Sequence, residues 1–191
     1  MRSKDYDKID VIFSAALQLI HADGIAGLTM AKIARAAGLA TGTLYIYFTN
    51  KEDLINALYR KLEKESLERF LSGYSEDMPF RESLKRVWTN YLKHRIDHHE
   101  ESVFLEQYYR SPYITSQHKR IAEQMKSPVH QLISRGKEEG VVRSDADEEI
   151  LFLAMLGFIR ELADEHVDGI YILNQSKIDK AFQLSWDMLT G

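Results

Sequence analysis

Apolar side chains recur along most of the chain at the three-to-four-residue spacing of an amphipathic helix, and strand-like alternation is almost absent. The first such stretch ends at Asp23-Gly24, where glycine favours the left-handed conformation that closes a helix. Its apolar members are Ile9, Ile12, Phe13, Ala16, Leu17 and Ile20. The spacing places all of them on one face, so we expect a helix that packs this face against a core.

Two short helices and a long one are expected next. Thr29 has the hydroxyl of an N-cap residue for a helix that runs to about residue 37, and Gly38 stands where that helix must stop. A second short helix fits residues 41–48, and Asn50 then caps a long helix that continues to about residue 71.

The rest of the chain predicts five more helices, separated by polar turns. Their approximate ranges are 80–97, 100–110, 114–139, 147–166 and 175–189. Ser127-Pro128 falls inside the third of these, where proline favours a break or a kink. The helix at 147–166 is apolar almost all round, which fits either a dimer interface or the central core helix of a monomer.

The predicted fold class is therefore all-α, with about nine helices. Residues 1–49 would form a compact head of three helices, and residues 50–191 a larger helical body. The length of 191 residues suits one domain, or one with a small appendage.

The amino-acid composition excludes several kinds of site and argues against secretion and membrane insertion. The chain has no cysteine, which excludes disulfides, thiolate metal sites and cysteine nucleophiles and fits a reducing cytoplasm. The charged N-terminus predicts no signal peptide, and the longest apolar run falls short of the roughly 20 residues of a membrane span. We therefore expect a cytoplasmic protein with no membrane partner.

Charge is spread unevenly over the net −4 of the chain. Residues 1–51 hold six basic and four acidic residues, a net +2, whereas the remainder holds 19 basic and 25 acidic residues, a net −6. A mildly basic head on an acidic body indicates an anionic partner at one end, although scattered surface charge explains so small a difference equally well.

Residues 29–48 have the form of a helix-turn-helix, with Ile33 and Leu44 as apolar contacts and Gly38 in the turn. The second helix carries small or hydrogen-bonding side chains, as a helix must if it approaches base edges in a major groove. These residues are Thr41, Gly42, Thr43, Tyr45 and Tyr47. Similar helix-turn-helix arrangements also occur in helical bundles that do not bind DNA, where such residues form an ordinary solvent-exposed face.

Lys51 follows the Asn50 cap at the start of the long helix, where a positive charge opposes the helix dipole. A phosphate bound there would be held by the free main-chain amides and by the lysine together. The alternative is an ordinary exposed lysine.

The segment from Thr29 to Leu54 forms a continuous string of recognisable positions. It reads Thr29-x-x-x-Ile33-Ala34-x-x-x-Gly38-Leu39-Ala40-x-Gly42-x-Leu44-Tyr45-x-Tyr47-Phe48-x-x-Lys51-x-x-Leu54. This string closely resembles the signature of TetR-family transcriptional regulators, and the resemblance covers about residues 9–60. Ala40 stands where that family often has serine, and Tyr47 where it often has histidine.

The resemblance implies a homodimeric DNA-binding regulator, most often a repressor, which binds double-stranded operator DNA of near-palindromic sequence. The implied DNA-binding residues are Thr29, Ala40, Thr41, Gly42, Thr43, Tyr45, Tyr47 and Lys51. Thr41, Gly42, Thr43 and Tyr47 are expected to face the groove, and Thr29, Tyr45 and Lys51 to hold phosphates. The resemblance also implies that the helices at about 147–166 and 175–189 pair between subunits, and that a small-molecule effector binds the body and tilts the helix at 50–71.

The residues that would bind the effector are less clearly indicated, because aromatic side chains serve a packed core as readily as a pocket. The candidates are Trp88, Tyr91, His94, Phe104, Tyr108, Met125 and Phe158. His94, His98 and Glu101 could hold a metal ion only on one continuous helix, and a break expected near residue 99 argues against that site. No cofactor is expected.

An enzyme and an adaptor without DNA binding are the alternative classes. The chain contains no dinucleotide or phosphate-loop motif, no nucleophile elbow and no zinc-protease motif, so we do not expect an enzyme. An adaptor that had lost DNA binding would have a damaged segment at 29–51, and here that segment is intact.

Overall fold

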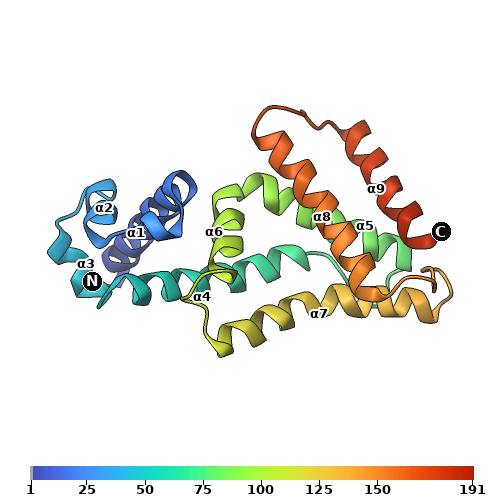
Figure 1. Cartoon of the computed structure of the whole chain (residues 1–191), viewed down its shortest axis with the longest axis horizontal. Helices are drawn as coiled ribbons and strands as arrows, with labels where there is room; N and C mark the ends of the chain where they lie inside the picture. Colours follow the sequence, from blue (N-terminus) through green and yellow to red (C-terminus); the bar gives the residue numbers. More distant parts are fainter. Residues whose placement is uncertain (1) are drawn as a thin grey trace. The chain divides into compact units, whose positions relative to one another are not determined.

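The computed structural model of the protein describes residues 2–191, with side chains described for residues 7–120, 123 and 126–191 (Figure 1). Over residues 2–191 it contains nine α-helices, one short 3-10 helix and no strand. The elements are α1 (Arg2–Asp23), η1 (Ile25–Gly27), α2 (Met30–Ala36), α3 (Thr41–Tyr47), α4 (Lys51–Phe70), α5 (Phe80–Asp97), α6 (His99–Tyr109), α7 (Ser116–Glu138), α8 (Glu148–Val167) and α9 (Gln175–Thr190). The all-α prediction is confirmed.

The helix boundaries are set by local chemistry at the expected residues. The side chains of Thr29, Asn50 and Asp147 each accept a hydrogen bond from the main-chain N–H three residues later, at 3.2, 2.9 and 2.8 Å. Gly24, which follows α1, and Gly38, which follows α2, have positive φ angles of 74° and 67°, which glycine adopts readily.

Ser127-Pro128 was predicted to break or kink its helix, and the helix is not broken there, because α7 continues through Pro128 to Glu138. Proline lacks a main-chain N–H and so removes one helical hydrogen bond, but the turns on either side are long enough to carry the helix on. The other predicted break is confirmed: α5 ends at Asp97 and α6 begins at His99.

The chain packs as two compact units. The head unit consists of Met1–Glu65 and Glu100–Lys119, and the body unit of Ser66–His99 and Arg120–Gly191. By packing, the head unit is therefore larger than the helix-turn-helix segment, because the first part of α4 and nearly all of α6 group with it.

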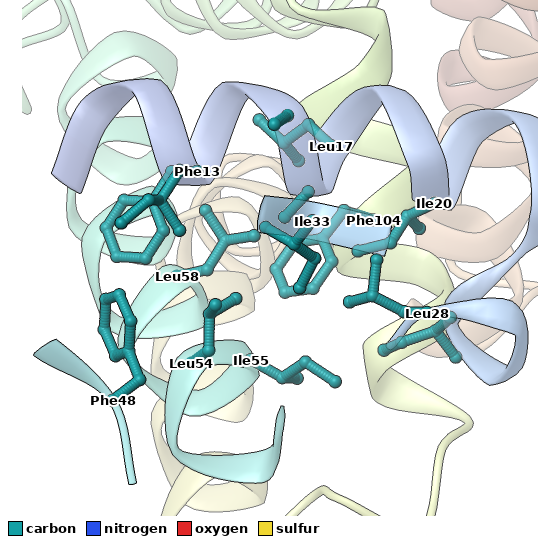
Figure 2. Packing of buried hydrophobic residues seen from close by; sticks show 14 of the residues in the cluster. Phe13, Leu17, Ile20, Leu28, Ile33, Phe48, Leu54, Ile55, Leu58 and Phe104 are labelled. Carbon is teal, nitrogen blue, oxygen red and sulfur yellow. The ribbon is translucent and has the colours of Figure 1, made fainter. Parts of the chain in front are cut away.

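The core of the head unit is assembled from α1, α2, α4 and α6. Figure 2 shows Phe104 of α6 among apolar side chains that include Ile20, Leu28 and Ile33. Phe104 and Ile33 are both completely buried. A segment distant in sequence thus supports the two short helices, which are too short to be stable alone.

The body unit has its own core, formed by residues of α5, α7, α8 and α9. The indole of Trp88, which is 1% exposed, donates from Nε1 to Oγ of Ser185 at 2.9 Å and lies edge-on to Phe182. The guanidinium of Arg95 pairs with Asp164 at 2.9 Å and ties α5 to α8. These contacts give the buried indole N–H and one terminal guanidinium nitrogen of Arg95 their hydrogen-bond acceptors.

One face of α8 and α9 remains uncovered. Leu151 and Met155 of α8 are buried, but Ile150 and Leu153 are each 57% exposed, and Leu184 of α9 is 62% exposed. The near-continuous apolar pattern of α8 therefore is not that of a helix buried on all sides by its own chain. Among the described residues, no helix is long and apolar enough to cross a membrane.

Candidate nucleic-acid interface

The helix α3 has a buried side and an open side. Leu44 is fully buried in the head core, and Phe48, which ends the helix, is 6% exposed. Since successive helical residues are rotated by about 100°, the spacing of each exposed residue from Leu44 sets the side on which it lies. The exposed residues are Thr41, Gly42, Tyr45 and Ile46, of which Gly42 and Ile46 lie directly opposite Leu44 and Tyr45 lies beside them, while Thr41 is exposed at the start of the helix.

Gly42 lies on this open side with nothing packed against it. A Cβ atom placed there would have no heavy-atom neighbour within 4 Å, so packing within the chain does not require glycine at this position. The absence of a side chain instead leaves the helix backbone accessible on its outer face.

Thr43 and Tyr47, also predicted to face a groove, are only half exposed. The ring of Tyr47 packs partly against the head core, so Tyr47 is directed less fully outward than Tyr45. Ile46 was not among the residues predicted to face a groove. Its position one turn after Gly42 and opposite Leu44 nevertheless indicates that it is exposed.

The three residues nearest the helix starts have distinct surroundings. Thr29 is exposed and caps α2, which leaves its hydroxyl proton available to a further acceptor. Ala40 is the N-cap of α3 and provides no side-chain hydrogen bond there. The ammonium of Lys51, at the start of α4, lies 5.3 Å from the ring centroid of Tyr113.

The start of α4 is held by three hydrogen bonds among Thr49, Asn50 and Asp53. The amide of Asp53 donates to the side chain of Asn50 at 2.9 Å, and the Asp53 carboxylate accepts from the amide of Thr49 at 3.0 Å and from its hydroxyl at 3.1 Å. The arrangement differs from a capping box in that Asp53 accepts from Thr49, the residue before the N-cap Asn50, and it fixes the direction of the chain between α3 and α4.

Residues of α6 bind to the rest of the head unit directly. The Gln107 side chain accepts a hydrogen bond from the amide of Ile25 at 2.8 Å. The hydroxyl of Tyr108 donates to Oδ1 of Asn56 at 2.8 Å and also lies within hydrogen-bonding reach of His118 Nδ1. The end of α6 is thereby joined both to the turn after α1 and to α4.

Tyr59 extends this cluster of buried polar side chains. Its ring stacks on Tyr108 with centroids 4.3 Å apart, and its hydroxyl donates to Glu63 at 3.2 Å. Burial raises the pKa of Tyr108 to about 12 and raises the pKa values of Tyr59 and Glu63, and it lowers the pKa of His118. Burial therefore favours the neutral form of each group.

The candidate effector residues are divided between the two units. Trp88, Tyr91, His94 and Phe158 belong to the body unit, whereas Phe104 and Tyr108 belong to the head unit. The side chain of Met125 lies outside the described residues. The seven candidates thus do not line a single site within either unit.

His94 is the polar member of the body set and is only 3% exposed. Its Nε2 lies 3.4 Å from Oγ of Ser66, while its Nδ1 has no hydrogen-bond partner among the described residues. Burial, followed by the neighbouring His98 and two arginines, lowers the pKa of His94 to about 3. The described residues contain no cluster of three or more metal-binding side chains.

Comparison with known proteins gives matches over both halves of the chain. Residues 12–58 match the family model described as bacterial regulatory proteins of the tetR family, and residues 79–190 match a tetracyclin repressor-like C-terminal domain. An HTH-type transcriptional regulator of Haemophilus influenzae is 26% identical over 97% of both chains. The fatty acid metabolism regulator protein of Bacillus subtilis is 26% identical over 88% of this chain and 85% of its own.

The fold is also shared with solved structures. The crystal structure of a TetR family transcription regulator from Marinobacter aquaeolei superposes with a TM-score of 0.86 at 25% identity, covering 99% of this chain and 98% of the other. These matches are to transcriptional regulators and not to enzymes.

Proposed function

The chain belongs to the TetR family of DNA-binding transcriptional regulators, and from this premise we propose that it is a cytoplasmic repressor that binds a near-palindromic operator as a homodimer and is released by a small molecule. The outer face of α3 carries the proposal. There Thr41, Gly42 and Tyr45 are exposed on the second helix of a helix-turn-helix. Such side chains let a helix approach base edges in the major groove.

Within this proposal, Thr41, Gly42 and Thr43 make the groove contacts near the start of α3, with Tyr47 at its edge. Thr29, Tyr45 and Lys51 hold phosphates, and the small side chain of Ala40 allows the start of α3 to come close to the DNA backbone. The phosphate contacts position the protein on the duplex, and the base contacts determine its sequence preference.

The uncovered face of α8 and α9 supports the dimer. Ile150, Leu153 and Leu184 would leave water on contact with the same face of a second copy, which favours association by the hydrophobic effect. Two copies of α3 would then reach successive major grooves, with half-sites about 34–36 Å apart.

We further propose that the effector acts on the head unit through α6. Gln107 and Tyr108 join α6 to Ile25 and Asn56, so a displacement of α6 alters the support of both the short helices and α4. The effector shifts operator binding only as far as its affinity differs between the protein with α6 in its original position and the protein with α6 displaced. Fatty acids are the first effectors to test, because a relative is named a fatty acid metabolism regulator.

A gel shift tests the proposal, using DNA from immediately upstream of the gene and excess nonspecific competitor. The expected result is a salt-sensitive, sequence-specific shift. Gly42→Leu should abolish it while leaving thermal stability unchanged, since the added side chain meets only open space. Ala22→Leu, which places the same side chain at an exposed site of α1, is the matched control.

If neither upstream DNA nor selection from random duplexes yields a bound sequence, the repressor proposal is wrong. If Gly42→Leu instead unfolds the protein, Gly42 has a structural role and not a role at the DNA.

A further inference from the structure

The outer face of α3 carries an isoleucine that the fold does not need. Ile46 is 77% exposed, which is more than any other large hydrophobic side chain that the structure describes. It lies on the opposite side of α3 from the fully buried Leu44. Because so little of Ile46 is removed from water, burial of its side chain contributes little to the stability of the head unit.

The neighbours of Ile46 define the kind of surface it belongs to. Gly42 lies one turn earlier on the same side and leaves open space beside the helix backbone. Tyr45, next to Ile46, is 54% exposed. A branched apolar side chain therefore projects beside a stretch of α3 that a base edge can approach closely.

We propose that Ile46 reads thymine, by placing its methyl groups against the 5-methyl group of a thymine in each half-site of the operator. The inference rests on the proposed function, because it assumes that α3 enters a major groove. Isoleucine has no hydrogen-bond donor or acceptor, so it cannot read the polar pattern of a base edge. The thymine methyl is the apolar group that a base pair presents in the major groove, and it is the partner that an aliphatic side chain recognises there.

Phosphate is excluded as the partner of Ile46 by the same chemistry, since an apolar group gains nothing from an anion. A protein partner docked on Ile46 is the other possible occupant. It predicts operator binding that does not depend on Ile46, and the experiment below separates the two.

The test begins with operators selected from random duplexes by the wild-type protein. Each thymine of the selected operator is then replaced by deoxyuridine, which removes one methyl group and leaves base pairing intact. For the wild type, we expect one symmetric pair of positions to be sensitive, with a loss of about fourfold in affinity per half-site, the value of one buried methylene-sized group.

Ile46→Ala should weaken binding to the thymine operator by a similar factor and should no longer distinguish thymine from deoxyuridine at those positions. Ile46→Thr retains one methyl group and should keep part of the discrimination. Ile170→Ala is the matched control, because Ile170 is a 71% exposed isoleucine of the body unit, and it should leave the whole deoxyuridine pattern unchanged.

The inference is overturned if Ile46→Ala binds the operator like the wild type, or if it weakens all operators equally and keeps the deoxyuridine penalties. Loss of folding in both Ile46 variants, measured by thermal unfolding, would also overturn it, since it would show that Ile46 is a structural residue. If the wild type selects no sequence at all, the proposed function itself fails.

Discussion

The head and body units differ in how they accommodate buried polar side chains. In the head, the hydroxyl of Tyr108 has Asn56 and His118 within hydrogen-bonding reach, and the hydroxyl of Tyr59 has Glu63. In the body, His94 is similarly buried, but its Nδ1 has no hydrogen-bond partner among the described residues.

This difference has an energetic meaning. A buried polar atom without a partner costs about 1–3 kcal/mol, whereas a satisfied cluster favours one arrangement over its alternatives. The head also contains one such atom, Oγ of Ser102, but the hydroxyls of Tyr59 and Tyr108 are both hydrogen-bonded and favour one arrangement of the side chains around them. In the body, Nδ1 of His94 is a buried atom without such a partner, and under the proposed function a hydrogen-bonding group of the effector would stabilise it.

The largest expected effect tests whether α6 is part of the head. Phe104→Ala should lower the free energy of unfolding by about 3–5 kcal/mol, because it removes a completely buried ring from the head core. Denaturant unfolding measures the change. Phe158→Ala in the body is the control and should cost less, because Phe158 is only half buried. A cost below about 1 kcal/mol for Phe104→Ala would show that α6 does not support the head.

The next largest effect tests the hydrogen bonds made by the hydroxyl of Tyr108. Tyr108→Phe removes only a hydroxyl and leaves Asn56 and His118 without that partner, so it should lower the free energy of unfolding by about 1–3 kcal/mol. Tyr171→Phe, on an exposed loop, is the matched control and should have no measurable effect. Equal stability of the two variants would mean that the cluster does not stabilise the head.

A smaller effect concerns the pH dependence contributed by His94. Its pKa is lowered from 6.5 to about 3 in the folded protein, so between these values the unfolded chain binds the proton more readily than the folded one. The stability contribution of His94 is therefore complete above pH 6.5 and is lost as the pH falls towards 3.

His94→Gln should flatten the stability profile over this pH range, measured by denaturant unfolding at a series of pH values. His21→Gln, at an exposed site of α1, should leave the profile as it is. The pKa of His118 is also lowered, but the wild type and both variants contain His118, so its contribution is the same in all three stability profiles. A profile unchanged in His94→Gln would contradict the assignment.

The smallest effect concerns a single phosphate contact. Lys51→Ala should weaken binding to all DNA sequences alike and reduce the slope of log affinity against log salt by about one. Lys180→Ala, an exposed lysine of α9, is the control for a general loss of charge. A slope that does not change in Lys51→Ala would remove Lys51 from the phosphate contacts.

Several features of the head could be predicted residue by residue from the sequence. Thr29 and Asn50 were predicted as helix caps and Gly24 as a helix end, and all three predictions are confirmed. The string from Thr29 to Leu54 also led to the family that the comparisons support. The roles assigned to individual DNA-binding residues stay predictions.

Other features depended on contacts that no local pattern encodes. The exposure of Ile46 and the partial burial of Tyr47 depend on how α3 is rotated against the head core. Phe104 and Tyr108 were grouped with body residues because they follow them in sequence, yet they pack in the head. The helix that was expected to break or kink at Pro128 continues through it without a break.

The sequence by itself determined where most helices begin and end, because a cap or a glycine with a positive φ acts within a few residues of the chain. It also determined the family, because the motif residues lie close together in one continuous segment. Only the tertiary structure decided which side of α3 is open, which unit α6 supports and which apolar residues of α8 stay uncovered. These outcomes depend on packing between segments far apart in sequence, and such packing is decided by the sum of many weak contacts.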